Sequence, residues 1–308
     1  GVMGQLVSNI FTNDLDLIDG KDFKSSNISD SADTIKGIYP SMSPLEALTW
    51  LTRNSANDGT PYFLYDTIQE GLQFKSYNDM LNEDVYRNYN DASFYTAETN
   101  TPEAYDEAKK KILSMSSDLN RSIYDSISDG AYSAKLHTLD IATKNYKQSL
   151  FAYNDLHSTE PHNPFSSQIK FEDTSVNMYT TNKQYYVSLN SKSYNQDNNY
   201  HRPAITSLLT KQAYFHNLGF MGLDIEVYGD FNLTVGKKVG VIIPKPAENL
   251  TQASGGKLNV IDKYIGGTYI VTSISHFFSG TDYKCSVGIQ KDSLGFDLDS
   301  KIELGKNS

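Results

Sequence analysis

Apolar and polar residues alternate most regularly in the last third of the chain. Every second residue is apolar from 223 to 227, and the same period of two returns over 239–243 and 283–289. A period of two places successive side chains on opposite faces of a strand, so each segment has one buried and one solvated face. Antiparallel sheets and small barrels show this pattern. We therefore expect a barrel-like antiparallel β domain in this part of the chain.

The segment after Ser43 carries the signals of a helix start. Ser43 is a good N-cap, Pro44 suits the first helical position, and Glu46 stands three residues after the cap, as a capping box requires. The expected apolar stripe consists of Leu45, Leu48 and Leu51, with Trp50 alongside. Asp58-Gly59 is the expected end of this helix.

Helical spacing of apolar residues predicts three further helices. The first opens the chain, over 1–10, and suggests that sequence upstream of Gly1 is missing. The second runs over 101–129, with a buried face made of Ala104, Ala108, Ile112, Met115, Leu119 and Ile123. The third runs over 202–218, with a face made of Ile205, Leu208, Leu209, Gln212 and His216.

Strand-like segments lie between these helices. The runs 62–67 and 71–76 flank a short turn and predict a hairpin. Two further runs, 133–143 and 146–155, also have extended character, and 184–189 (QYYVSL) is the one clear strand in an Asn- and Ser-rich region. Together with the helices, these segments predict an α+β protein.

Composition narrows the classes of function. The formal net charge is −10, and phosphate neutralisation needs a surplus of Lys and Arg, so non-specific nucleic-acid binding is not expected. Lys109, Lys110 and Lys111 are interpreted as a solvated helix face. One cysteine allows no intrachain disulfide, and no apolar run reaches the roughly 20 residues of a membrane-spanning helix. Twenty-two tyrosines suit half-buried surface, as in a subunit of an assembly.

The sequence shows no clear catalytic or metal-binding centre. The chain contains no HExxH, P-loop, GxSxG or GxGxxG motif. His157 and His162 with Glu160 form only a weak metal constellation in an expected loop. Asp224 and Glu226 are a carboxylate pair of the kind that glycosidases use, but an acidic chain contains many such pairs. We therefore expect no catalytic residue, no metal and no cofactor.

Two strand residues have polar chemistry that we interpret as structural. Cys285 alternates with apolar neighbours, which favours a buried thiol over a nucleophile. His276 is expected to share a strand face with Ile270, Thr272 and Ile274. A neighbouring backbone or side-chain group should satisfy its ring.

The stretch GDFNLTVG joins two of the predicted strands, and the strand GTYIVTSISH follows it. This order resembles the central baseplate hub protein of contractile-tailed (T-even-like) bacteriophages. In that family a loop of the form G-N/D-F-N-L-T-x-G joins two strands, and an F/Y-x-V-x-x-x-x-H strand follows. The matching residues are Gly229, Phe231, Asn232, Leu233, Thr234 and Gly236 in the loop, and Tyr269, Val271 and His276 in the strand.

The resemblance covers residues 203–294, while 1–81 is similar only in the order of its elements and 157–199 does not align. It implies an antiparallel, barrel-like tube domain with helical and mixed α/β domains around it. The implied divisions are 1–129 as a helix-rich α/β domain, 130–155 with 218–292 as the second tube-forming domain, 156–217 as an insertion, and 293–308 as a tail. A first, N-terminal tube domain would be missing.

The family's role implies a structural subunit of the virion's tail baseplate, assembled in the host cytoplasm. Three copies would form a pseudo-sixfold ring between the sixfold tail tube and the threefold central spike. The implied partners are two further copies, the spike, tube or tube-initiator proteins and other baseplate proteins, with no membrane and with DNA only as passing cargo. An acidic lumen would keep DNA from sticking.

In the motif loop we expect Phe231 and Leu233 to point inward and the glycines to adopt turn dihedrals. The loop would then orient a strand pair without any catalytic role.

Three alternatives remain at this point. A tail-tip cell-wall glycosidase would show a carboxylate pair in a cleft, and a carbohydrate-binding tail module would show exposed aromatic side chains in a groove. Hub-like components of contractile injection systems and of type VI secretion share the tube domain, so the sequence does not separate them from a virion protein.

Overall fold

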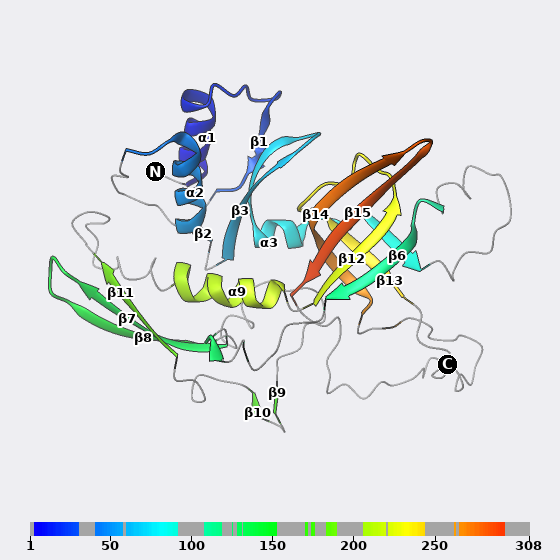
Figure 1. Cartoon of the computed structure of the whole chain (residues 1–308). Coiled ribbons are helices and arrows are strands. Elements are labelled where there is room, and N and C mark those ends of the chain that lie inside the picture. The colour runs from blue at the N-terminus through cyan, green and yellow to red at the C-terminus, as the bar shows by residue number, and fades with distance from the viewer. Residues whose placement is uncertain are drawn as a thin grey trace, which may run out of the picture. The chain divides into compact units, whose positions relative to one another are not determined.

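The computed structural model of the chain (Figure 1) describes residues 3–30, 41–57, 60–91, 108–118, 125, 128–130, 132–152, 170–171, 174–175, 183–189, 206–219, 221–243, 262 and 265–292. The chain divides into two compact units. We call Gly1–Asn82, Arg121–Pro161 and Ile169–Asn217 the mixed unit, and Glu83–Asn120, His162–Gln168 and Leu218–Ser308 the barrel unit. His157, Glu160, His162 and the tail 293–308 lie outside the described residues.

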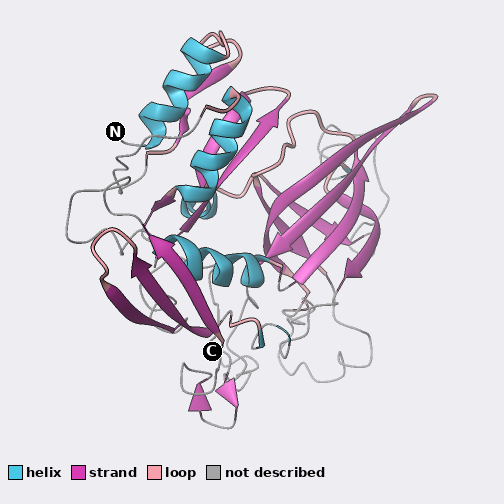
Figure 2. Cartoon of the chain, turned by 60° about the vertical axis from the view of Figure 1, so that its left-hand side comes forward, coloured by secondary structure: helices cyan, strands magenta, loops and turns pink. Residues whose placement is uncertain are grey.

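The barrel unit contains a closed barrel with the strand order β12-β15-β14-β13-β5-β6 (Figure 2). Its strands are β5 (Arg87–Asp91), β6 (Lys111–Asp118), β12 (Met221–Tyr228), β13 (Lys238–Ile242), β14 (Gly267–Ser279) and β15 (Asp282–Lys291). Most neighbours are antiparallel, but β5 runs parallel to both β13 and β6. The expected α+β fold with a barrel-like β domain is confirmed.

Alternation builds the barrel core as the sequence predicts. Along β12, buried side chains alternate with half-buried or exposed ones. The buried residues of β12 stand directly opposite those of β15, in the pairs Leu223–Ile289, Ile225–Val287 and Val227–Cys285. Each pair removes two apolar side chains from water on the same face, which fixes the register because a slip by one residue would turn all of them outward.

The predicted helix over 101–129 is wrong at 111–118, which forms strand β6. β6 pairs antiparallel with β12 from Ile112 to Asp118. Ile112 is buried in the barrel, whereas Met115 is 38% exposed. Ile112 and Met115 are three residues apart, which is a helical spacing, but a register shift between Glu226 and Val227 places both opposite buried residues of β12. Pairing with β12 decided in favour of the strand.

In the mixed unit, a four-stranded sheet has the order β1-β4-β3-β2. Its strands are β1 (Phe23–Ile28), β2 (Ala56–Asn57), β3 (Thr60–Thr67) and β4 (Gly71–Ser76). β3 and β4 form the predicted hairpin. A helix α1 (Met3–Asn9), continued by the π-helical turn η1 (Ile10–Asp14), buries its apolar face on this sheet, together with α2 (Pro44–Asn54). A short helix α3 (Tyr77–Asn82) follows β4.

The capping box of α2 is present as predicted. The backbone N–H of Ser43 donates to Glu46 Oε2 at 2.9 Å, and the backbone N–H of Glu46 donates to Ser43 Oγ at 3.4 Å. The predicted apolar stripe needs one correction: Leu45 is 64% exposed, and Ala47 is buried in its place beside Leu48 and Leu51. At 100° per residue, positions 47, 48 and 51 lie closer together on the helix surface than 45 and 51 do.

A second sheet of the mixed unit has the order β11-β7-β8, from β7 (Ser133–Asp140), β8 (Tyr146–Ala152) and β11 (Gln184–Leu189). All three strands occur where the sequence places them. One face of the sheet buries Ala134, Leu136 and Phe151 against the helix α9 (Lys211–Leu218). The separate two-residue strands β9 (Lys170–Phe171) and β10 (Thr174–Ser175) pair with each other.

The expected grouping of 130–155 with 218–292 in one domain differs from the observed sheets. β7 and β8 belong to the mixed unit, and the barrel takes β5 and β6 instead. The apolar face of β7 is already covered by α9, so it has no buried face to offer a barrel. The expected domain 1–129 is divided in the same way, because the barrel unit begins at Glu83.

The predicted helix over 202–218 is interrupted by a π-helical turn, η4 (Thr206–Thr210), before α9. Leu209, Ala213 and Tyr214 are buried, whereas Leu208 is 38% exposed. A π turn adds a residue per turn and so rotates the following face relative to the even spacing that the prediction assumed. Residues 201–205, including Ile205, lie outside the described part.

Candidate functional site

The loop 229–236 connects β12 to β13 and is anchored to β5 through Asp230. The Asp230 carboxylate accepts a hydrogen bond from Tyr86 Oη at 2.7 Å and pairs with Arg87 Nη1 at 2.8 Å. It also accepts from the backbone N–H of Asn232 at 2.9 Å, as in an Asx turn. Burial, followed by the hydrogen bond to Asp230, raises the pKa of Tyr86 to about 12. Asp230 therefore holds the loop, a role that sequence reasoning missed.

The second half of the loop is buried and tied to β14. Leu233 and Thr234 are 1% and 9% exposed. Lys237 Nζ donates to the carbonyl of Asn232 at 2.7 Å and lies 4.6 Å from the centre of the Tyr86 ring. Gly236 has φ 86°, a left-handed conformation that favours glycine, and its N–H donates to the carbonyl of Val271 at 2.8 Å.

Gly229 is needed for space. Its φ is not in the left-handed region, but a Cβ at this position would stand 2.0 Å from Cδ1 of Tyr283. The Tyr283 ring lies directly on the glycine, and the N–H of Gly229 donates to the carbonyl of Tyr283 at 2.9 Å. The loop therefore depends on its two glycines for different reasons, whereas we expected turn dihedrals at both.

We predict that Gly229→Ala destabilises the barrel unit by about 1–3 kcal/mol, because the new methyl group forces the Tyr283 ring away. Urea unfolding followed by near-ultraviolet circular dichroism measures the loss. The matched background is Tyr283→Ala, in which the ring is absent and the same glycine substitution should cost much less. An equal cost in both backgrounds would show that the ring contact is not the cause.

The hairpin of β14 and β15 extends past its barrel neighbours (Figure 1). Pairing of β12 with β15 ends at Tyr228 opposite Lys284, and pairing of β13 with β14 ends at Ile270. Backbone hydrogen bonds with the 236–237 turn reach Val271. Within the described part of the chain, no strand pairs with 272–279 on the side that faces β13. Among the described strands, this eight-residue segment is therefore unpaired on that edge.

Four rings cluster on the same hairpin, and we call them the aromatic cluster: Phe231, His276, Phe278 and Tyr283. Phe278 stacks on Tyr283 with ring centres 4.4 Å apart, and Phe231 lies 4.9 Å from Tyr283 and 5.5 Å from His276. Phe231 and Phe278 are 49% and 64% exposed. The expectation that Phe231 points inward is wrong, because Leu233 fills the core and Phe231 packs on the projecting hairpin instead.

A β-bulge places His276 in this cluster. Val271 pairs with Ile289 and Ser273 with Gly288, so Thr272 is the extra residue, and its hydroxyl donates to the carbonyl of Gly288 at 3.1 Å. The extra residue moves His276 off the face of Ile270 and Thr272, contrary to the prediction, and onto the face of Cys285. This register change had no sequence signal.

The ring of His276 has polar partners, as expected. Its Nδ1 lies 2.9 Å from Tyr283 Oη and 3.2 Å from Cys285 Sγ. Cys285 is fully buried, as the alternation of its strand predicted. Tyr269 and Val271, the other strand residues of the motif, are buried in the barrel core. The motif residues therefore divide between the core, a fixed turn and an exposed cluster.

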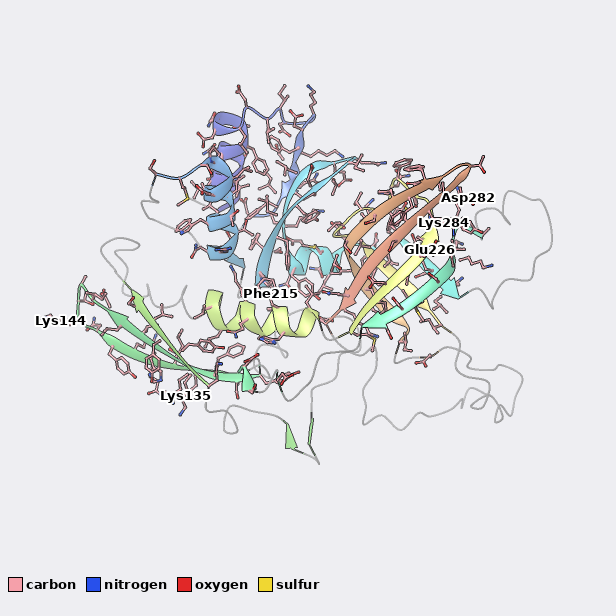
Figure 3. The ribbon with its side chains drawn as sticks, viewed as in Figure 1. Lys135, Lys144, Phe215, Glu226, Asp282 and Lys284 are labelled. Carbon is pink, nitrogen blue, oxygen red and sulfur yellow. The ribbon has the colours of Figure 1, made fainter. Side chains whose placement is uncertain are left out.

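The carboxylate pair of β12 lies on the outer face of the barrel. Glu226 Oε1 pairs with Lys284 Nζ at 3.0 Å (Figure 3), and Glu226 Oε2 accepts from Ser114 Oγ at 3.1 Å. The hydrogen bonds from Lys284 and Ser114 hold the pKa of Glu226 below its usual range. A glycosidase needs one carboxyl group with a raised pKa as general acid, so Glu226 is unsuited to that role.

Among the described residues, no group of three His, Cys, Asp or Glu side chains is placed to hold a metal ion. None of the helices in the described ranges is long and apolar enough to cross a membrane.

No family model and no curated protein matches the chain. Solved structures with partial similarity include the tail protein from Neisseria meningitidis MC58, with 11% identity, TM-score 0.47 and coverage of 96% of this chain and 69% of that one. The 43 kDa tail protein of prophage MuSo2 from Shewanella oneidensis has 8% identity, TM-score 0.41 and coverage of 83% and 56%. The phage P2 baseplate in its activated conformation with Ca has 11% identity, TM-score 0.23 and coverage of 86% and 58%.

Proposed function

We propose that this chain is a structural subunit of the central baseplate hub of a contractile phage tail. Three copies form a pseudo-sixfold ring that joins the tail tube to the central spike. Its place is the virion's tail baseplate, its other partners are tube-initiator and baseplate proteins, and it carries no enzymatic activity. The proposal starts from the resemblance of the GDFNLTVG loop and the GTYIVTSISH strand to that family. The solved structures described above are also tail and baseplate proteins, but TM-scores below 0.5 do not establish a shared fold.

The observation that carries the proposal is the projecting hairpin. A ring subunit must offer a surface to each neighbour, and an open strand edge is a ready site for pairing with another chain. Residues 272–279 supply such an edge, and the aromatic cluster supplies exposed apolar area beside it. Aromatic side chains are enriched at interface cores because they bury a large area with little loss of conformational entropy.

A glycosidase needs one protonated and one ionised carboxyl group, and Lys284 and Ser114 keep Glu226 ionised, so Glu226 would not serve as the general acid of such a pair. A hub of another contractile injection system has the same requirements for ring formation as a phage hub. The two differ in the spike that the ring binds, so binding of a cognate spike distinguishes them.

We predict that the purified chain has three times its monomer mass of 34.5 kDa, and that Phe278→Ser shifts it towards the monomer. The substitution removes the most exposed ring of the aromatic cluster from the proposed interface. Truncation of a central aromatic residue costs about 2 kcal/mol or more at an interface, which is about thirtyfold in affinity. Light scattering coupled to size-exclusion chromatography measures the mass, with the protein alone and mixed with the candidate spike.

The matched control is Phe277→Ser. Phe277 is the adjacent residue, is 57% exposed and points to the opposite face of the same strand, so its loss should leave the trimer intact. A wild-type chain that stays monomeric and does not bind the spike would contradict the hub. Equal dissociation by both variants would contradict the assignment of the interface to the aromatic cluster.

A further inference from the structure

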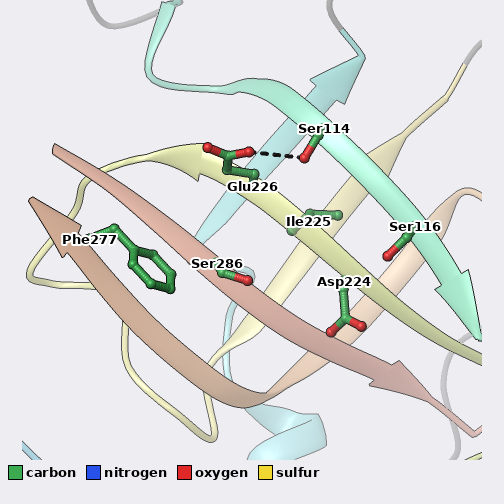
Figure 4. Close-up of a pocket in the computed structure, with 7 residues that line it drawn as sticks. All are labelled: Ser114, Ser116, Asp224, Ile225, Glu226, Phe277 and Ser286. Atoms are coloured by element: carbon green, nitrogen blue, oxygen red, sulfur yellow. Dashed lines mark hydrogen bonds between the residues drawn. The ribbon is translucent and has the colours of Figure 1, made fainter. Parts of the chain in front are cut away.

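The outer face of the barrel has a hollow of about 340 Å³ that the proposed ring interface does not use (Figure 4). It crosses four adjacent strands, β6, β12, β15 and β14. Its lining consists of Ser114, Ser116, Asp224, Glu226, Ser286 and Phe277, with Ile225 beneath. The volume lies within the range of small-molecule sites, roughly 300–1,000 Å³. We infer that this hollow binds a neutral saccharide.

Gly288 on β15 leaves space beside Asp224, one of the residues that line the hollow. A Cβ there would stand 3.2 Å from Asp224 Oδ1 and 2.3 Å from Ser273 Oγ. Any side chain would therefore displace the Ser273 hydroxyl and crowd the Asp224 carboxylate. Ser114, Ser116 and Ser286 have short side chains, so the surface is recessed between Phe277 and the carboxylates of Asp224 and Glu226.

The charge of the lining selects the class of ligand. Glu226 is neutralised by Lys284 at 3.0 Å, which leaves Asp224 as the uncompensated carboxylate of the lining. Across the described residues, neither the carboxylate of Asp224 nor the hydroxyls of Ser116 and Ser286 have a hydrogen-bond partner. A divalent cation requires six or more oxygen ligands, usually with several carboxylates, so one free carboxylate is a poor cation site.

A saccharide can contact both the polar groups and the aromatic ring of this surface. Its hydroxyl groups can donate to the Asp224 carboxylate and exchange hydrogen bonds with the serine hydroxyls. Its C–H face can lie against the ring of Phe277, whose π face carries partial negative charge and attracts polarised C–H groups. The free carboxylate repels anionic sugars such as uronic and sialic acids. The site therefore favours a neutral hexose or N-acetylhexosamine unit.

Saturation-transfer difference NMR on the full chain tests the inference. The probes are maltose and the disaccharide of N-acetylglucosamine, with galacturonic acid as the anionic comparison, each at millimolar concentration. We expect a signal from at least one neutral probe and none from galacturonic acid. Asp224→Asn and Phe277→Ser should each weaken the binding about tenfold or more, as expected for loss of a charged hydrogen bond or of the ring contact.

Two matched variants separate the site from the rest of the barrel. Asp282→Asn changes an exposed carboxylate at the start of β15 (Figure 3), and Phe278→Ser changes the ring next to Phe277, on the opposite face of β14. Both should bind the neutral probe as the wild type does. No signal from either neutral probe, or equal binding by all four variants, overturns the inference. Because Phe278→Ser is expected to break the trimer and Phe277→Ser the saccharide site, failure of one proposal is distinguishable from failure of the other.

Discussion

Tyr269→Ala is expected to destabilise the barrel unit by about 3–5 kcal/mol, which is the usual cost of removing a large buried aromatic side chain. Tyr269 is 1% exposed and lies in the barrel core between Met221 and Lys291. Its hydroxyl donates to the carbonyl of Ile265 and lies 3.3 Å from Met221 Sδ. Lys291 Nζ stands 4.9 Å from the ring centre. The substitution leaves a cavity and removes the ring that lies beside the Lys291 ammonium, which still donates to the carbonyl of Gly266.

Native-state hydrogen exchange of peptides from β12 and β15, read by mass spectrometry, measures this change. Tyr269→Phe is the matched control, because it keeps the ring and its contact with Lys291 and removes only the hydroxyl. Its cost should be about 1 kcal/mol, that of one hydrogen bond. Similar costs for the two variants would show that the hydroxyl, and not the buried ring, determines the stability that Tyr269 contributes.

The mixed unit is expected to become more stable as the pH rises from 7.5 to 9.5, through Lys211. This residue is 7% exposed, and its Nζ donates to the carbonyls of Thr52 and Arg53 at 3.2 and 2.6 Å, in the last turn of α2. Burial lowers the pKa of Lys211 from 10.5 to about 8. Between these two values the unfolded chain binds a proton that the folded chain does not, so stability increases with pH. The gain over this range is roughly 2 kcal/mol.

The single tryptophan, Trp50, stands in α2 and reports unfolding of the same unit by fluorescence. In Lys211→Met the titrating group is absent and the pH dependence should become nearly flat. The range stops at 9.5 because exposed tyrosines of the unfolded chain begin to ionise near pH 10. A wild-type slope that persists unchanged in Lys211→Met would contradict this role of the lysine.

Sequence signals correctly predicted the structural elements whose determinants are residues close to one another in the chain. The capping box at Ser43 and the turn between 67 and 71 involve neighbours three or four positions apart, so the sequence contains all of their determinants. Alternation over 223–228 and 283–289 likewise predicted which residues of β12 and β15 are buried. Periodicity failed at 111–118, where the three-residue spacing of Ile112 and Met115 predicts a helix but occurs in a strand with a register shift.

The candidate site was predicted only in part. The motif residues were named from the sequence, but a bulge at Thr272 and the filling of the core by Leu233 place His276 and Phe231 differently from the prediction. The anchor Asp230 has no local signal, since its partners Tyr86 and Arg87 are more than 140 positions away. The hollow beside Asp224 is formed by strands that are distant in the sequence.

The sequence by itself determined the class of the fold, the alternating core strands of the barrel, the helix cap at Ser43 and the burial of Cys285. These follow from periodicity and from short-range hydrogen bonds. The tertiary structure decided which strands close the barrel, because β5 and β6 join it through backbone pairing that any side chain permits, while the apolar face of β7 is covered by α9. Backbone pairing is nearly independent of side-chain identity, so it leaves little trace in a single sequence.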